Sequence, residues 1–175
     1  MKEKHIGGLA GPVALLIALH ADGAAARQAA HLHRERTHKG PSMAAALDGV
    51  ADVLQAVLAG GSLRDALDAA RRQGSNPYLA GEFEAWAGKD DLEVVGRILS
   101  PACYVEDSVP AVMHLARKYA GRPEEGLVAN TMVGGDNCYR GAVLGALLGA
   151  ESGPEGWPAR WRENLLVKPA LPEIR

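Results

Sequence analysis

The sequence contains few aromatic residues and few cysteines. Aromatic residues make up 5% of the 175 residues, with a single Phe. Because strands are enriched in aromatic and β-branched side chains, this scarcity argues against a protein built from sheets. Two cysteines are too few for a disulfide framework, and a chain of this length buries a core without one. We therefore expect free thiols and a cytoplasmic protein.

Neither charge sign prevails, and long apolar runs are absent. The chain has 19 Lys and Arg against 21 Asp and Glu. A protein that binds nucleic acid through its phosphates needs a basic face, so nucleic acid is not an expected partner. The apolar runs at 11–21 and 141–150 are far shorter than the roughly 20 residues of a membrane helix. The first run also lacks a signal-peptide cleavage site. We predict neither a membrane span nor a signal peptide.

The hydrophobic residues that are present favour helices. They make up 47% of the chain, are mostly Ala, Leu and Val, and recur at helical spacing. A further helix is expected between a cap at Ser62 and a turn at 74–77. The pattern predicts the other helices over 12–21, 24–36, 41–58, 78–86, 91–99, 107–119, 123–131, 137–150 and 157–165. We expect one compact, all-α, multi-helix domain over 1–175, with an irregular tail at 167–175.

The most informative segment is a Gly-Gly-Asp turn followed by a glycine-rich helix. Gly134 and Gly135 precede Asp136, at the predicted start of the helix over 137–150. Asp at such a position caps a helix by accepting hydrogen bonds from backbone N–H groups. A carboxylate there also suits a hard cation such as Mg²⁺. Either role fits Asp136, and one carboxylate can serve both. The glycines at 141, 145 and 149 share a helix face that a neighbouring backbone can approach closely.

Several blocks of the sequence resemble the C-terminal half of the ADP-ribosylglycohydrolase family and occur in the family's order. They are Thr37-His38, the bend Gly60-Gly61-Ser62-Leu63, the helix start CYVEDSVPAV at 103–112, the segment 123–136, and the spacing of Pro158, Trp161 and Leu165. The resemblance spans residues 7–166. The order of the blocks makes it more specific than any block alone.

The resemblance implies an all-α fold and a hydrolase that cleaves a glycosidic bond of ADP-ribose with the help of Mg²⁺ ions. The expected partners are ADP-ribose-type small molecules or ADP-ribosylated substrates. The alternative is a descendant without catalysis, which either binds ADP-ribose or a nucleotide or serves as a structural protein like the family's crystallin relative.

The loop at 134–139 departs from the family pattern. The family sequence is G-G-D-T-D-T, whereas this chain has G-G-D-N-C-Y. Asp136 keeps the first carboxylate, Cys138 replaces the second, and Tyr139 replaces the last threonine. A thiol is a poor ligand for Mg²⁺. The family's acidic N-terminal motif also has no counterpart here. We therefore expect a truncated fold, completed by an oligomer or by a complementing N-terminal fragment.

Cys138 allows two interpretations. A helix N-terminus lowers a thiol's pKa, so Cys138 could act as a nucleophile with His38 or His114 as its base. Alternatively, it is a small, partly buried residue in a former carboxylate position. His31 and His33 point to different sides of a helix and are interpreted as a polar helix end.

The remaining candidates are residues that would bind the ligand. Glu106 and Asp107 either line the ligand cleft or complement a helix dipole. Arg140 either contacts a phosphate or forms a surface salt bridge. The ligand-binding candidates are Gly134, Gly135, Asn137, Tyr139, Arg140, Glu106, Asp107 and His38.

Overall fold

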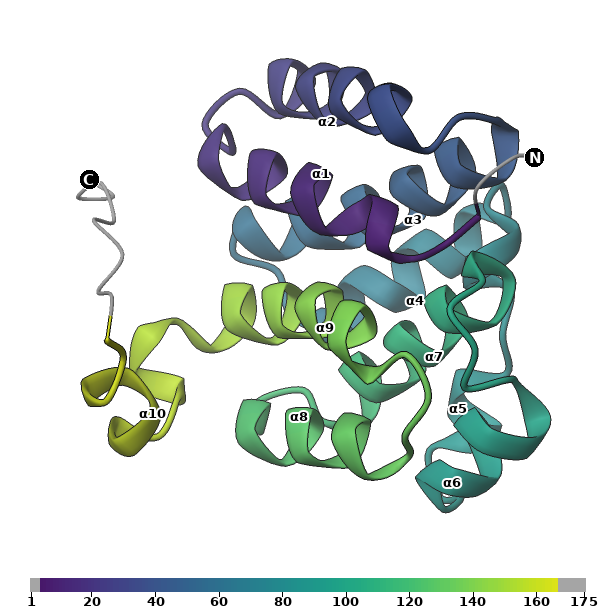
Figure 1. Ribbon diagram of the computed structural model, residues 1–175, viewed down its shortest axis with the longest axis vertical. Coiled ribbons are helices and arrows are strands. Elements are labelled where there is room, and N and C mark those ends of the chain that lie inside the picture. Colours follow the sequence, from purple (N-terminus) through teal and green to yellow (C-terminus); the bar gives the residue numbers. More distant parts are fainter. Residues whose placement is uncertain (1–3, 167–175) are drawn as a thin grey trace.

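The computed structural model describes residues 4–166, and all its named elements are helical (Figure 1). The α-helices are α1 (Gly7–Ala18), α2 (Gly23–Thr37), α3 (Pro41–Leu58), α4 (Leu63–Gln73), α5 (Phe83–Trp86), α6 (Asp91–Glu93), α7 (Val105–Lys118), α8 (Pro123–Met132), α9 (Asn137–Ser152) and α10 (Ala159–Glu163). The 3-10 turns η1 (Pro77–Leu79) and η3 (Pro154–Gly156) and the π-helical turn η2 (Val94–Ile98) complete the set. The predicted all-α class is confirmed. The tail predicted at 167–175 lies outside the described residues.

Local sequence signals set the ends of α2 and α4. The Asp22 side chain caps α2 by accepting a hydrogen bond from the Ala25 N–H (3.0 Å). At the start of α4, the Asp65 N–H donates to Ser62 Oγ (3.1 Å), and the Ser62 hydroxyl donates to Asp65 Oδ2 (2.7 Å). Gly74 ends α4 in the left-handed conformation, with φ +65°. The predicted bounds of α2 and α3 agree with the structure to within one residue.

The start of α1 was predicted wrongly, because a contact between distant segments decides it. The helix begins before Pro12, which is buried inside it. The Ile6 N–H donates to the Cys103 carbonyl (2.8 Å), and the Val105 N–H donates to the Lys4 carbonyl (2.9 Å). This pairing joins the chain's first described residues to the start of α7. Local periodicity carries no signal for such a contact.

Two predicted short helices are also corrected. The helix predicted over 78–86 is split into the turns η1 and α5, and the one predicted over 157–165 shortens to α10. The Asn76 side chain accepts a hydrogen bond from the Tyr78 N–H (3.0 Å) and so starts η1. Short segments of this kind are held by their neighbours more than by helix propensity.

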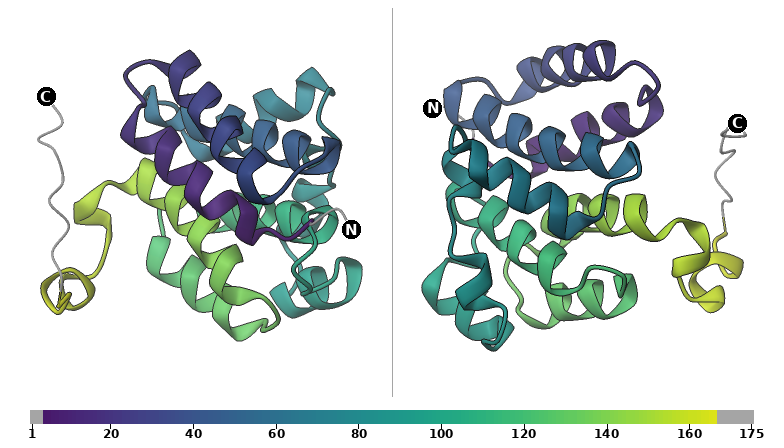
Figure 2. Two further views of the ribbon diagram at one scale, coloured as in Figure 1. Left: turned by 45° about the horizontal axis from the view of Figure 1, so that its top comes forward. Right: turned by 180° about the vertical axis from the view of Figure 1, so that it is seen from behind.

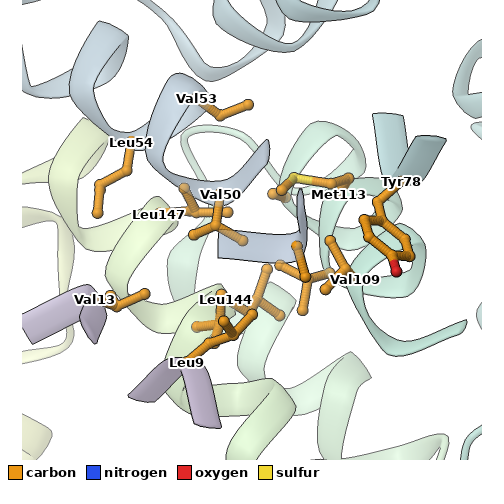
Figure 3. Close-up of a cluster of buried hydrophobic side chains, with 14 of the residues drawn as sticks. Leu9, Val13, Val50, Val53, Leu54, Tyr78, Val109, Met113, Leu144 and Leu147 are labelled. Atoms are coloured by element: carbon orange, nitrogen blue, oxygen red, sulfur yellow. The ribbon is translucent and has the colours of Figure 1, made fainter. Parts of the chain in front are cut away.

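Helices α3, α7 and α9 supply the centre of the core. Every residue from Ser108 to Ala116 of α7 is buried, so this helix is covered on all sides. Figure 3 shows side chains of the three helices pointing toward one another, among them Val50 of α3, Met113 of α7 and Leu147 of α9. By length and composition α3 could cross a membrane, but half of it is buried within the protein, as in an ordinary core helix.

Helix α8 packs against the face of α9 that carries Gly141 and Gly145. The two helices lie side by side in both views of Figure 2. A Cβ on Gly141 would lie 3.0 Å from Asn130 Nδ2, and one on Gly145 would lie 3.8 Å from Leu127 Cδ2. The predicted approach of a neighbouring backbone is corrected, because the nearest atoms to these glycines belong to side chains of α8.

A partly buried carboxylate, Asp91, attaches α6 to α7. Asp91 accepts hydrogen bonds from Lys118 Nζ (2.8 Å) and the Tyr119 hydroxyl (2.6 Å), and His114 Nε2 lies 3.3 Å from its Oδ1. Burial by itself raises the pKa of Asp91, but these three partners bring it well below its ordinary 3.8. Burial and the Asp91 carboxylate raise the pKa of Tyr119 to about 12.

We expect Leu147→Ala to lower the free energy of unfolding by about 2 to 5 kcal/mol, because truncation of a fully buried side chain leaves a cavity. Leu92→Ala makes the same change at a side chain that is 53% exposed, and its effect should stay below about 0.5 kcal/mol. Urea unfolding followed by circular dichroism measures both. Equal losses would contradict this assignment of the core.

A second prediction concerns acid stability. Because folding lowers the pKa of Asp91, its contacts add stability above the ordinary value of 3.8, and this contribution is lost as the pH falls below it. We expect Asp91→Asn to lower the free energy of unfolding at neutral pH. In acid, the difference in free energy of unfolding between wild type and variant should become smaller. Urea unfolding at a series of pH values tests this. The exposed Glu82→Gln is the control; a gap for Asp91→Asn that does not vary with pH contradicts the prediction.

Candidate functional site

The Gly-Gly-Asp turn connects α8 to α9 and presses against the loop that precedes α7. Gly134 and Gly135 have φ values of +71° and +67°, in a region that favours glycine. A Cβ on Gly135 would lie 2.0 Å from the Pro101 carbonyl oxygen, whereas one on Gly134 would meet nothing within 4 Å. The Asp136 N–H donates to the same Pro101 carbonyl (3.0 Å). Gly135 is therefore required for close approach as well as for conformation.

Asp136 is the N-cap of α9. Its Oδ1 accepts a hydrogen bond from the Tyr139 N–H at 3.5 Å. The capping interpretation is confirmed. Within residues 4–166, the second carboxylate oxygen accepts no hydrogen bond, so it remains available to a ligand.

Arg140 is fully buried beneath the turn. Its Nε donates to Asn130 Oδ1 (2.6 Å), and its Nη2 donates to the Asn130 carbonyl (3.0 Å) and the Gly134 carbonyl (2.8 Å). Burial lowers the pKa of Arg140, and the negative charge of Asp136 opposes that shift. The surface salt bridge considered for Arg140 is wrong, and no exposed surface of this side chain is left for a phosphate. Its structural role is to hold the turn against α8.

Asn130 is a residue of the site that the sequence analysis missed. This buried side chain also donates from Nδ2 to the Asn137 carbonyl (2.9 Å), so it links α8 to the first residue of α9. The Asn137 side chain in turn lies 3.4 Å from the Thr131 carbonyl. A polar residue in the last turns of a helix was the only available signal.

The first turn of α1 brings two predicted site residues together. A Cβ on Gly7 would lie 3.2 Å from the Tyr139 ring, and one on Gly8 would lie 2.4 Å from Cγ of His38. Because Gly7 and Gly8 have no side chains, the rings of Tyr139 and His38 can pack against the backbone of α1. His38 also shares a hydrogen bond of 2.8 Å with Thr37 Oγ1. Figure 1 shows α1 and α9 starting next to each other, and both run toward the side of α10.

Glu106 lies at the start of α7, beside the same segment. Lys4 Nζ donates to Glu106 Oε1 at 2.5 Å, with both side chains partly exposed. Burial opposes ionisation of Glu106, but the Lys4 ammonium outweighs it and lowers the pKa of the carboxyl. Asp107 follows in the first turn of α7, where negative charge complements the helix dipole. Residues 4–8 therefore contact Tyr139, His38 and Glu106, which are distant in sequence.

Cys138 is not brought to a base. The structure exposes it, which corrects the expectation of a partly buried residue, and both cysteines are free. His114 is buried beside Asp91, and the described part of the chain contains no hydrogen bond between Cys138 and a histidine. This geometry gives no support to a thiol nucleophile.

The residues of the turn do not fit Mg²⁺. No group of three or more His, Cys, Asp or Glu side chains in residues 4–166 is placed to hold a metal ion. Asp136 is the turn's single carboxylate and already caps α9. Magnesium requires several oxygen ligands in near-octahedral geometry, and Cys138 offers a soft thiol instead.

Fold and site together define an all-α domain with a carboxylate held at a helix entrance. A family model described as ADP-ribosylglycohydrolase matches residues 7–174. The chain therefore belongs to the ADP-ribosylglycohydrolase family, which confirms the resemblance inferred from the sequence. The family acts on ADP-ribosylated substrates, its members are generally metal-dependent, and its function is glycohydrolase-like. No curated protein matches the chain.

The two turn glycines form a matched pair for mutation. Gly134→Ala should cost about 1 to 2 kcal/mol, because alanine disfavours the left-handed conformation. Gly135→Ala meets the same conformational cost and also the Pro101 carbonyl, 2.0 Å from its new Cβ, so its loss of stability should be clearly larger. Urea unfolding of the two variants decides the point. Equal losses would show that the turn does not press against Pro101.

Proposed function

We propose that this protein recognises the ADP-ribosyl group of a substrate at the end of the bundle where α1, α3, α7 and α9 begin, and that it serves in hydrolysis of the ADP-ribosyl glycosidic bond. The observation that carries the proposal is the Gly-Gly-Asp turn, which holds Asp136 at the entrance of α9 beside the half-exposed ring of Tyr139. Membership of the family supports the substrate class.

In this proposal each exposed group has a separate task. The free oxygen of Asp136 accepts hydrogen bonds from ribose hydroxyls, because an ionised carboxylate is a strong acceptor. Tyr139, 50% exposed, offers a flat face for stacking against the adenine base. Glu106 and Asp107 stand at the start of α7, where their carboxylates accept hydrogen bonds from further hydroxyl groups of the ligand. Arg140 acts through the backbone of the turn only.

Hydrolysis requires more acidic groups than the turn supplies. Glycosidic hydrolysis usually employs a pair of carboxyl groups, and the turn contributes Asp136 alone. We therefore propose that catalysis depends on groups from outside residues 4–166, supplied by an oligomeric partner or a complementing segment.

The second candidate function is recognition of ADP-ribose without catalysis. It is favoured by the replacement of a family carboxylate by Cys138, which is exposed and has no histidine partner within the described residues. An assay that follows release of ADP-ribose from an ADP-ribosylated peptide separates the two functions. Release supports the hydrolase, and binding without release supports the recognition protein.

Calorimetric titration with ADP-ribose tests the site itself. Asp136→Asn keeps a good helix cap but removes the charge, so we expect roughly tenfold weaker binding with stability nearly unchanged. Asp136→Ala should lose stability as well. Asp22→Asn makes the same chemical change at the cap of α2 and should leave affinity unaltered.

The same titration is repeated with and without Mg²⁺. Because the turn does not fit Mg²⁺, we expect the same ADP-ribose affinity with and without it. Affinity that requires Mg²⁺ and disappears in Asp136→Asn would contradict the metal-free site. Absence of any binding to wild type would contradict recognition altogether.

A further inference from the structure

A basic cleft lies at the opposite end of α7 from the Gly-Gly-Asp turn. Its volume is about 420 Å³, and it is lined by Arg64, Arg117, Lys118, Arg122, Glu84 and Ala87. Helices rise 1.5 Å per residue, so Lys118 lies roughly 18 Å along α7 from Glu106. Four cations and one carboxylate thus face a cleft that is separate from the candidate ADP-ribosyl site.

Arg64 has no carboxylate to explain its position. It lies in the first turn of α4, where the helix dipole disfavours a positive charge. Its Nε donates to the Arg117 carbonyl at 3.4 Å. No carboxylate of residues 4–166 lies within 4 Å of its guanidinium nitrogens, and both terminal nitrogens keep their N–H groups free.

Arg117 has unused donors too. Its side chain is 15% exposed, and its contact with a carboxylate is a long one, 3.5 Å from Nη2 to Asp68 Oδ1. Within the described chain its guanidinium makes no hydrogen bond of normal length. Arginine presents five N–H donors in a fixed plane, which suits two-point binding of phosphate. Arg64 and Arg117 therefore hold the free donors of the cleft.

Lys118 and Arg122 are held in fixed positions, and each also forms an ion pair with a carboxylate that does not line the cleft: Lys118 Nζ with Asp91 (2.8 Å) and Arg122 Nη1 with Glu125 (2.7 Å). Lys118 Nζ lies 5.7 Å and the Arg122 guanidinium carbon 5.2 Å from the centre of the Tyr119 ring. The ring is itself anchored by the hydrogen bond from its hydroxyl to Asp91. Arg122 also donates to the Lys118 carbonyl (2.9 Å). Side chains held in advance lose little freedom when an anion binds, which favours affinity.

We propose that the basic cleft is a binding site for a small phosphate-bearing anion, with Arg64 and Arg117 as its hydrogen-bond donors and Lys118 and Arg122 as its fixed charges. The volume lies within the range of small-molecule sites. Four of the six lining residues are cationic and one is acidic, so the cleft suits an anionic ligand. This site goes beyond the proposed recognition of ADP-ribosyl groups.

Inorganic pyrophosphate, titrated by calorimetry into the intact protein at low salt, is the probe. We expect saturable binding that weakens as sodium chloride is added, because salt screens exposed charges. Arg64→Gln should raise the Kd about tenfold, the effect of losing a hydrogen bond between charged groups. Arg72→Gln is the matched control, since it removes an exposed arginine from the same helix outside the cleft. Both replaced side chains are exposed, so both variants are expected to fold.

Two outcomes overturn the proposal. One is the absence of saturable pyrophosphate binding to the wild type. The other is an equal Kd for Arg64→Gln and Arg72→Gln. It would mean that pyrophosphate binding responds to the protein's overall charge and not to the cleft. Asp136→Asn separates this site from the proposed function, because it should leave the pyrophosphate Kd unchanged even if ADP-ribose recognition fails. A joint loss in Asp136→Asn would mean that one site binds both ligands, and would also overturn the proposal.

Discussion

The arrangement of the candidate site depends on the hydrogen bonds that the buried guanidinium of Arg140 donates. This guanidinium connects α9 to the Asn130 side chain and carbonyl in α8 and to the Gly134 carbonyl of the turn. Burying such a cation is costly unless its donors are paired. Here backbone and amide oxygens pair them, so the turn is fixed by the same contacts that satisfy the charge. Asp136 is held in place as a consequence.

The two ends of α7 differ in charge and in chemistry. At its start, the chain's first described residues meet the end of α2 and the start of α9, and Glu106 and Asp107 add acidic side chains to this end. At its end, Arg117 and Lys118 meet Arg64 of α4. Each arrangement agrees with the helix dipole of α7. Helix α7, whose middle from Ser108 to Ala116 is buried, thus separates the candidate ADP-ribosyl site from the basic cleft.

The conformation of the Gly-Gly-Asp turn is explained without a bound metal ion. Two glycines with positive φ and a capping aspartate need no metal, since the cap and Arg140 satisfy the polar groups of the turn. A structural requirement is therefore sufficient to explain the Gly-Gly-Asp sequence. Family membership and metal binding are separate properties, and the first does not establish the second in this chain.

The sequence predicted the helical class and the bounds of α2, α3 and α4, and it offered the cap as one of two roles for Asp136, because caps, glycines and apolar periodicity act within a few residues of one another. It could not place the start of α1, which depends on hydrogen bonds to residues 103–105. Nor could it tell that Arg140 is buried or that Gly7 and Gly8 make room for Tyr139 and His38. These points depend on the packing of the whole fold, because each is set by the distant segment that contacts the residue, and the local sequence pattern does not specify that segment.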